Sequence, residues 1–217
     1  MFSLTGDLIR AQRSADELLD DVLSCGAARL VEVDGPQHFR TYPAVSQQEA
    51  SSFRRTLERH GASASILGIY DDRAGWPGPG GLDEAEAFIG AQLRSARLLG
   101  VPAARVMFGL RPELLRRVAR QAEKHGVSVW QEVQGALTPG SATFEQQVQA
   151  LKDLDCAHLG LVLDLSACMP RLPVTYLQAL RARGVPVEAT QALDDAWVGG
   201  GDRALAQQVS DMSSEES

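Results

Sequence analysis

The sequence predicts an α/β fold in which strands and helices alternate around a parallel sheet. Three observations support this fold class. Short apolar, β-branched runs recur along the chain, longer segments of helical periodicity separate them, and glycine or capping residues mark most of the boundaries. Crossovers between parallel strands are almost always right-handed, so such a sheet either winds open or closes into a barrel. The alternation alone does not decide between the two.

Six strands are expected from the apolar runs. The most apolar of them is Leu159–Asp164, and turn residues follow several of the others. The expected strands cover residues 2–4, 29–33, 64–70, 105–108, 127–133 and 159–164.

Six helices are expected between and after these strands. The hydroxyl of Ser14 can cap a helix that ends at Gly26, and Ser46 with Glu49 forms a capping-box pattern. Pro112 suits the first turn of a helix, where its missing amide hydrogen costs nothing. The expected helices cover residues 14–26, 46–60, 82–99, 112–125, 143–154 and 174–183, and a loop rich in Gly and Pro covers 71–81.

Composition excludes several classes of protein. The chain has 217 residues, enough for one domain or two small ones, and its net charge of -7 argues against general nucleic-acid binding. The arginines of Arg111–Arg120 have the spacing of the solvated side of an amphipathic helix. No stretch approaches the roughly 20 apolar residues that cross a bilayer, and the first residues lack the pattern of a secretion signal. We therefore expect a cytoplasmic protein without a membrane segment.

Two kinds of cofactor motif are missing. The cysteines Cys25, Cys156 and Cys168 form no CxxC pair, so neither a disulfide framework nor a zinc knuckle is expected, and structural roles are favoured. The GxGxxG and GxxxxGK[ST] patterns, which cradle phosphates in doubly wound folds, are also missing.

Polar residues follow several of the expected strands, where parallel sheets bind their ligands. Glu132 and Asp164 carry the most weight, because each comes at or after the end of an apolar run on a neighbouring strand. Two such carboxylates could share a divalent cation or divide acid and base roles. Alternatively, each caps a helix or pairs with an arginine. Other polar residues near strand ends are Glu32, Asp34, His38, Tyr70, Asp71, Asp72, Gln134 and Ser166.

Of the four histidines, only His38 is placed for ligand binding or proton transfer. His60 and His125 each precede a glycine that ends a helix, where a cation stabilises the helix dipole. His158 precedes its strand and so lies at the opposite end from the expected site.

Four segments resemble the xylose-isomerase-like group of sugar isomerases and epimerases. They are Arg29–Arg40 (RLVEVDGPQHFR), Ala96–Val101 (ARLLGV), Ala122–Glu132 (AEKHGVSVWQE) and Leu159–Ser166 (LGLVLDLS), and the likeness extends over roughly residues 1–185. Members of the group are (β/α)8 barrels of TIM type that use a divalent metal to move protons along a sugar. Others in the group hydrolyse or cleave related substrates.

The resemblance implies a set of site residues. Glu132 and Asp164 match the first two ligands of the metal, which would be Mg²⁺, Mn²⁺ or Co²⁺, and both would take part in catalysis with His38. Substrate binding is expected from Glu32, Asp34, Tyr70 and Gln134.

The chain also departs from the group. The last two metal ligands of the group, a histidine and a glutamate from the seventh and eighth strands, have no clear match, since no histidine follows His158. An eight-unit barrel usually needs about 250 residues. We therefore expect an incomplete barrel of about six to seven β/α units in residues 1–198, a disordered polar tail in 199–217, and either a homo-oligomer or a partner subunit that completes the barrel.

Three functions are compatible with these features. The first is metal-assisted proton transfer on a sugar or polyol-like small molecule, by isomerisation or epimerisation. The second is a catalytically impaired or partner-dependent subunit that keeps the barrel scaffold. The third is a metal-free lyase or cyclase that uses Glu132 or Asp164 as an acid.

Overall fold

The computed structural model describes residues 14–198, apart from 27, 71–80, 108, 135–138, 140 and 165–168. The strand expected at residues 2–4 and the tail expected at 199–217 lie outside the described residues, as do Asp71, Asp72, Ser166 and Cys168.

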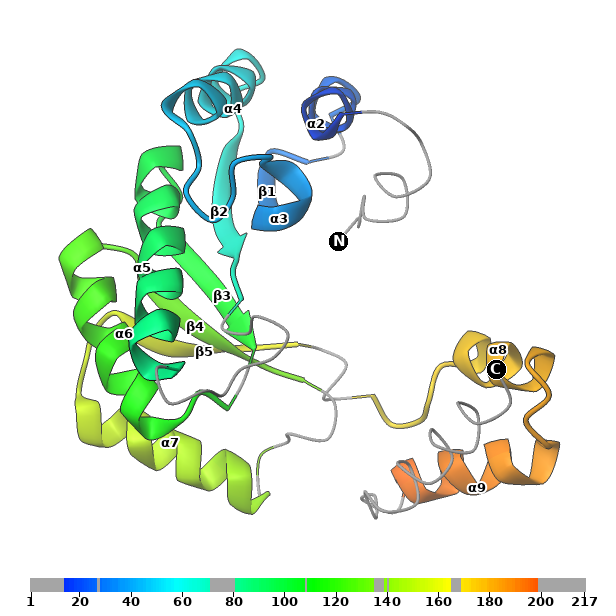
Figure 1. Ribbon diagram of the computed structural model, residues 1–217. Coiled ribbons are helices and arrows are strands. Elements are labelled where there is room, and N and C mark those ends of the chain that lie inside the picture. The colour runs from blue at the N-terminus through cyan, green and yellow to red at the C-terminus, as the bar shows by residue number, and fades with distance from the viewer. Residues whose placement is uncertain are drawn as a thin grey trace. The chain divides into compact units, whose positions relative to one another are not determined.

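The described strands form one parallel sheet in which the spatial order follows the chain, β1-β2-β3-β4-β5 (Figure 1). The predicted fold class, an incomplete parallel α/β barrel, is therefore confirmed. Each of the five strands lies within about two residues of its expected position. Their bounds are β1 Leu30–Asp34, β2 Ser63–Gly68, β3 Ala103–Met107, β4 Ser128–Val133 and β5 Leu159–Leu163.

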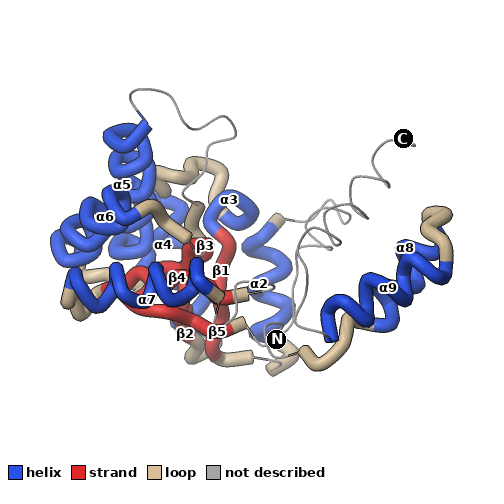
Figure 2. The backbone as a smooth tube through the Cα atoms, turned by 90° about the horizontal axis from the view of Figure 1, so that it is seen from below, coloured by secondary structure: helices blue, strands red, loops and turns tan. Residues whose placement is uncertain are grey.

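Helices α4, α5, α6 and α7 lie along one side of the sheet (Figures 1 and 2). Ser14 caps α2 as expected and also forms a capping box with Glu17, and the capping box expected at Ser46 is present. Helix α6 ends at Gly126, whose φ of 61° is the left-handed conformation that glycine adopts readily. The helices preceding and accompanying the strands are α2 Ala15–Ser24, α3 Gly35–His38, α4 Gln47–Arg59, α5 Gly81–Leu99, α6 Pro112–His125 and α7 Ala142–Leu154.

The hydrophobic core lies between this helical layer and the sheet. Its fully buried side chains include Phe53 of α4, Ile89 and Leu93 of α5, Leu115 of α6 and Leu67 of β2. Each such side chain contributes roughly 1.5–3 kcal/mol by leaving water. Burial on one face of the strands leaves their other face available for polar side chains.

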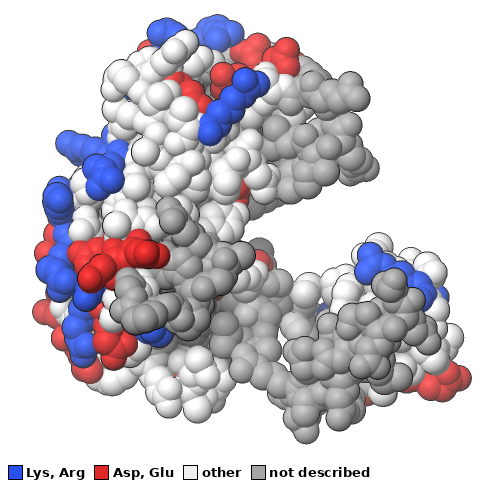
Figure 3. Space-filling view, viewed as in Figure 1, with Lys and Arg blue, Asp and Glu red and all other residues white. Residues whose placement is uncertain are grey.

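Charged side chains cover the outside of the helical layer. Lysine and arginine are interspersed there with aspartate and glutamate (Figure 3). Arg116 and Arg120 of α6 are exposed while Leu115 and Val118 of the same helix are buried, so the interpretation of the arginine cluster as a solvated helix face is confirmed. Within the described ranges, no helix has both the length and the apolar character of a membrane span.

A second unit comprises residues 134–138 and 163–217. Its described helices are α8, Val174–Ala182, and α9, Val187–Val198. Asp194 of α9 accepts hydrogen bonds from Arg171 and from the backbone amide of Leu172, and the Arg171 guanidinium lowers the pKa of Asp194. The indole of Trp197 donates to the carbonyl of Met169 at 2.8 Å. The sequence predicted α8, as it did α2 and α4 to α7. It did not predict α9 or the one-turn helix α3.

Candidate functional site

An arginine on the third strand joins carboxylates from two other strands. The Arg105 Nε atom donates to Glu32 Oε1 at 2.6 Å, and its Nη1 atom donates to Glu132 Oε2. The side chains of Arg105, Glu32 and Glu132 are 24%, 21% and 16% exposed, respectively, so the group is largely shielded from water. Glu132 therefore pairs with an arginine, which was one of the two interpretations left open by the sequence.

Strand alternation places these side chains on one face of the sheet. Ala104 and Val106 are buried in the core, so Arg105 between them points to the opposite face. The same alternation puts Glu132 opposite its buried neighbours Gln131 and Val133. Polar groups from separate strands thus converge on the side of the sheet that faces away from helices α4 to α7.

Gly68 gives these side chains room to approach one another. In the register of the sheet, Gly68 pairs with Asp34 on one side and with Arg105 on the other. A Cβ atom at position 68 would lie 3.4 Å from Asp34 Oδ2 and 3.6 Å from Arg105 Nη2. Because glycine has no side chain, Asp34 and Arg105 can both occupy the space above β2.

The site has an excess of negative charge. Glu32 and Glu132 pair with the guanidinium of Arg105, and Asp34 lies across Gly68 from it, so among the described residues three carboxylates share this part of the sheet with one guanidinium. Partial burial opposes the charge of Arg105, but the hydrogen bonds and Coulomb attraction of Glu32 and Glu132 outweigh it and raise the pKa of the guanidinium. Arg105 is therefore a permanent cation within an acidic surrounding.

A second polar network fixes Asp34 and Tyr70. The hydroxyl of Tyr70 donates to Asp34 Oδ2 at 2.5 Å, while Asp34 Oδ1 accepts from the backbone amide of Gln37 and so caps α3. The buried amide of Gln92 accepts from the backbone amide of Tyr70 at 2.8 Å and donates to its carbonyl at 2.7 Å. Tyr42 donates its hydroxyl to Gln92, and burial, followed by the charge of Asp34, raises the pKa of Tyr42.

His38 lies among aromatic side chains. Its ring centroid is 4.6 Å from that of Phe39 and 5.3 Å from that of Phe53, both in edge-to-face geometry. Its Nε2 atom lies 3.2 Å from Asp16 Oδ1, and this contact lowers the pKa of Asp16. The structure thus gives His38 a packing environment, and its expected part in proton transfer stays a prediction.

Gln134 and Asp164 directly follow β4 and β5, at the strand ends where the sequence placed them. Both are partly buried, and both belong to the second unit. Their expected roles, substrate binding for Gln134 and metal ligation for Asp164, stay predictions.

The described residues do not make up a metal site. Within those ranges, no three His, Cys, Asp or Glu side chains come together in a way that could hold a metal ion. Glu132, the first expected ligand, already gives one oxygen to Arg105. The donors that are present form an ion-paired carboxylate cluster, which does not fit a divalent metal.

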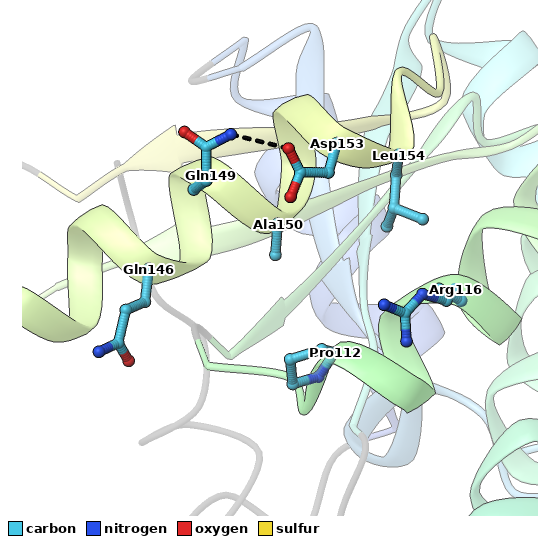
Figure 4. A pocket seen from close by; sticks show the side chains of 7 residues that line it. All are labelled: Pro112, Arg116, Gln146, Gln149, Ala150, Asp153 and Leu154. Atoms are coloured by element: carbon cyan, nitrogen blue, oxygen red, sulfur yellow. Dashed lines mark hydrogen bonds between the residues drawn. The ribbon is translucent and has the colours of Figure 1, made fainter.

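A pocket of about 300 Å³ opens elsewhere, between α6 and α7 (Figure 4). The side chains of Gln149 and Asp153 are hydrogen-bonded at its rim, at 2.7 Å. None of the predicted site residues lines this pocket, whose lining consists of Pro112, Arg116, Gln146, Gln149, Ala150, Asp153 and Leu154.

Arg105, Tyr42 and Gln92 belong to this region without having been predicted from the sequence. Arg105 was detectable in principle, because a charge inside an otherwise apolar strand (AARVM) needs a partner when the sheet is covered. Gln92 and Tyr42 carried no such signal, since their pairing depends on contacts across 50 residues of sequence.

Comparison with known proteins places the chain among xylose-isomerase-like barrels by fold. D-Psicose 3-epimerase from Clostridium cellulolyticum H10, solved with D-tagatose, superposes with a TM-score of 0.58 and 17% identity, over 78% of this chain and 64% of that one. A xylose isomerase-like TIM barrel protein from Mycobacterium smegmatis, in complex with magnesium, gives a TM-score of 0.52 and 16% identity over 76% and 61%. The chain has this fold as a partial barrel.

Two curated relatives are nearer in sequence. The 3'-dehydrocarminate deglycosidase alpha subunit of a Microbacterium species is 30% identical over 169 residues, which is 77% of this chain and 48% of the relative. The C-glycoside deglycosidase alpha subunit of Arthrobacter globiformis is 29% identical over 203 residues, or 91% and 56%. The chain spans about half the length of these relatives. No protein-family model matches the chain.

Proposed function

We propose that the chain is the barrel part of a sugar-processing subunit whose chemistry begins with removal of a proton next to a sugar carbonyl. The observation that carries the proposal is the placement of Glu132 at the carboxyl end of β4, held by Arg105 beside Glu32 and Asp34. The likeness to sugar epimerases in fold, and to deglycosidase alpha subunits in sequence, supports a sugar as the substrate class.

One first step serves epimerisation, isomerisation and deglycosylation alike. A carboxylate takes the proton, the C–H electron pair becomes a carbon–carbon double bond, and the carbonyl oxygen takes the negative charge. Return of the proton to the same carbon from the other face gives an epimer, and return to the former carbonyl carbon gives an isomer. Loss of a leaving group from the adjoining carbon gives deglycosylation instead.

The site residues keep the roles expected from the sequence as proposals. Glu132 and Asp164 serve as acid and base, with His38 assisting proton movement, and the sugar hydroxyls are bound by Glu32, Asp34, Tyr70 and Gln134. The Mg²⁺, Mn²⁺ or Co²⁺ that the resemblance implies is left out of this proposal, because the described carboxylates do not fit it, and the cytoplasmic location stays a prediction.

The active form is proposed to contain more than this chain. Relatives that match it are named as alpha subunits, which supports a partner subunit. A partner subunit, or a second copy of the chain, would supply the remaining strands of the barrel. This proposal includes the partner-dependent subunit that the sequence suggested, since the group's metal ligands from the seventh and eighth strands have no clear match in this chain.

Deuterium exchange tests the proposal at its first step. The chain, purified alone and after co-expression with a beta subunit of a C-glycoside deglycosidase, is incubated in D₂O with D-fructose, D-psicose or a 3'-dehydro C-glycoside, and deuterium at the carbon next to the carbonyl is followed by mass spectrometry. We expect incorporation that Glu132→Gln lowers at least about a hundredfold, the scale typical of a lost acid–base group.

Glu86→Gln is the matched control, because Glu86 also pairs with an arginine, Arg117, but on the outer helical layer. If Glu132→Gln exchanges deuterium as fast as the native chain does, Glu132 is not the acid–base group. Absence of exchange with all three compounds, alone and after co-expression with a beta subunit of a C-glycoside deglycosidase, would overturn the proposed function.

A further inference from the structure

The position that the fold family gives to a metal ligand is occupied here by an ion pair. Glu132 matches the first expected ligand, yet one of its oxygens accepts a hydrogen bond from Arg105 Nη1. The same guanidinium reaches Glu32 through Nε at 2.6 Å. A positive charge is therefore already present between two carboxylates of the site.

We propose that Arg105 is the resident cation of this site and keeps Glu132 from serving as a ligand of a divalent metal. The guanidinium satisfies the two glutamates with directional hydrogen bonds, which are stronger when both partners are charged. Like charges repel, so a divalent ion at the remaining oxygen of Glu132 has to bind a few ångströms from a fixed cation or displace it.

The surroundings of Arg105 keep it in this position. Its side chain is 24% exposed, and its Nη2 atom lies 3.6 Å from the place that a side chain at Gly68 would take, so the sheet leaves a fitted space for it. Moving the guanidinium outward would leave Glu32 and Glu132, both mostly buried, without their partner. An unpaired buried charge is costly, and this cost opposes the exchange of Arg105 for a metal.

Metal titration of the full 217-residue chain tests the proposal. Mn²⁺ binding is measured by calorimetry and by the electron paramagnetic resonance signal of free Mn²⁺, with no sugar present. The native chain is expected to show no saturable site tighter than about 1 mM. Arg105→Met is expected to bind Mn²⁺ at least about tenfold more tightly, because the repulsion is gone and Glu132 is released from its ion pair.

Three further variants give the result a single interpretation. Arg117→Met removes an arginine of similar exposure that also pairs with two carboxylates, Asp83 and Glu86, and it should behave as the native chain. Arg105→Met combined with Glu132→Gln should lose the gain. If Arg105→Met alone fails to fold, Arg105→Met combined with Glu32→Gln removes one unpaired carboxylate and should still show the gain.

Two results would overturn the proposal. The first is one equivalent of Mn²⁺ bound by the native chain with micromolar affinity that Glu132→Gln abolishes. The second is a folded Arg105→Met variant with unchanged or weaker binding, since a residue that merely orients a metal ligand weakens binding by about 10–100-fold when removed. Because no sugar is used, the outcome is independent of whether the chain acts on a glycoside.

Discussion

Gly35, the first residue of α3, is in close contact with the ring of Tyr42. A Cβ atom at position 35 would lie 2.0 Å from Tyr42 Cε2, so the ring would have to move. Helix propensity favours alanine over glycine by about 1 kcal/mol, whereas overpacking costs about 1–3 kcal/mol. Because the Tyr42 hydroxyl is held by Gln92, we expect the steric cost to prevail and Gly35→Ala to lower the free energy of unfolding by about 1–2 kcal/mol in urea titrations.

Gly90, inside α5, provides the matched control. A Cβ atom there would come within 3.1 Å of Gln121 Oε1, the far end of a flexible side chain that can move aside. Gly90→Ala should therefore either raise the free energy of unfolding or lower it by no more than about 0.5 kcal/mol. Equal stability of Gly35→Ala and the native chain would show that the Tyr42 ring does not pack tightly on α3.

Glu49 makes the stability of the chain depend on pH in the acid range. Burial alone would raise its pKa, but hydrogen bonds from Thr41, Ser46 and the backbone amides of Ser46 and Arg40 outweigh burial and lower it to about 2. A carboxyl whose pKa is lowered by folding stabilises the protein above its unfolded pKa, about 4.3, and that stabilisation is lost as the pH falls toward the folded value.

Thermal unfolding of the native chain and of Glu49→Gln measures this contribution. The native chain should have the higher Tm at pH 6, and the difference should shrink between about pH 4.5 and pH 2. A Tm difference that stays constant over this range would mean that Glu49 contributes through its shape and not through its charge.

At the scale of elements, local chemistry in the sequence was enough to place most helices and strands. Capping boxes at Ser14 and Ser46 and the glycine after His125 are read within a few residues, and they set the bounds of α2, α4 and α6. Helix α9 was missed although Pro186 precedes it just as Pro173 precedes the predicted α8, and α3 was missed because its Gly-Pro pair also suits a turn.

The candidate site was predicted less completely than the fold. Strand-end counting brought Glu32, Asp34 and Tyr70 to the correct edge of the sheet. It could not foresee that Arg105 would join Glu32 to Glu132, because these residues lie 73 and 27 positions away from it and meet only through the register of the four strands β1 to β4. Sequence spacing gives the strand on which a side chain lies, and packing decides its partner.

Helix α8 is expected to be the least protected of the described helices. It has no buried residue, and Val174 and Tyr176 are 67% and 47% exposed, whereas α5 contains fully buried side chains such as Ile89 and Leu93. Amide hydrogens of Val174–Ala182 should exchange at least about 100-fold faster than those of Gly81–Leu99. Slow exchange in α8 would indicate that another chain covers it.

At the scale of the whole molecule, the last described strand has an uncovered side. Leu161 and Leu163 of β5 are 37% and 50% exposed, whereas Val106 of β3 and Val129 of β4 are 1% exposed. Strands with a free edge and apolar side chains tend to associate. We expect the purified chain to form oligomers at micromolar concentration in sedimentation experiments.

Leu161→Gln combined with Leu163→Gln should shift that equilibrium toward the monomer. Leu30→Gln serves as the control, because Leu30 is also exposed, at 63%, but lies at the start of β1. If the double variant and the native chain associate equally, β5 is not the contact. If the native chain is monomeric at all concentrations, this strand does not drive self-association.

The order of the strands in the sheet is also the order in which a ribosome releases them. Each strand from β2 to β4 can therefore pair with a neighbour that has already emerged, once the crossover segment between the two strands has been released. Glu32 has no partner until Arg105 emerges, and Arg105 makes its second ion pair only after Glu132 has emerged. The cluster of Glu32, Arg105 and Glu132 is consequently completed only when β4 has docked. A nascent chain interrupted before β3 would expose the unpaired carboxylate of Glu32 on the side of the sheet that faces away from α4.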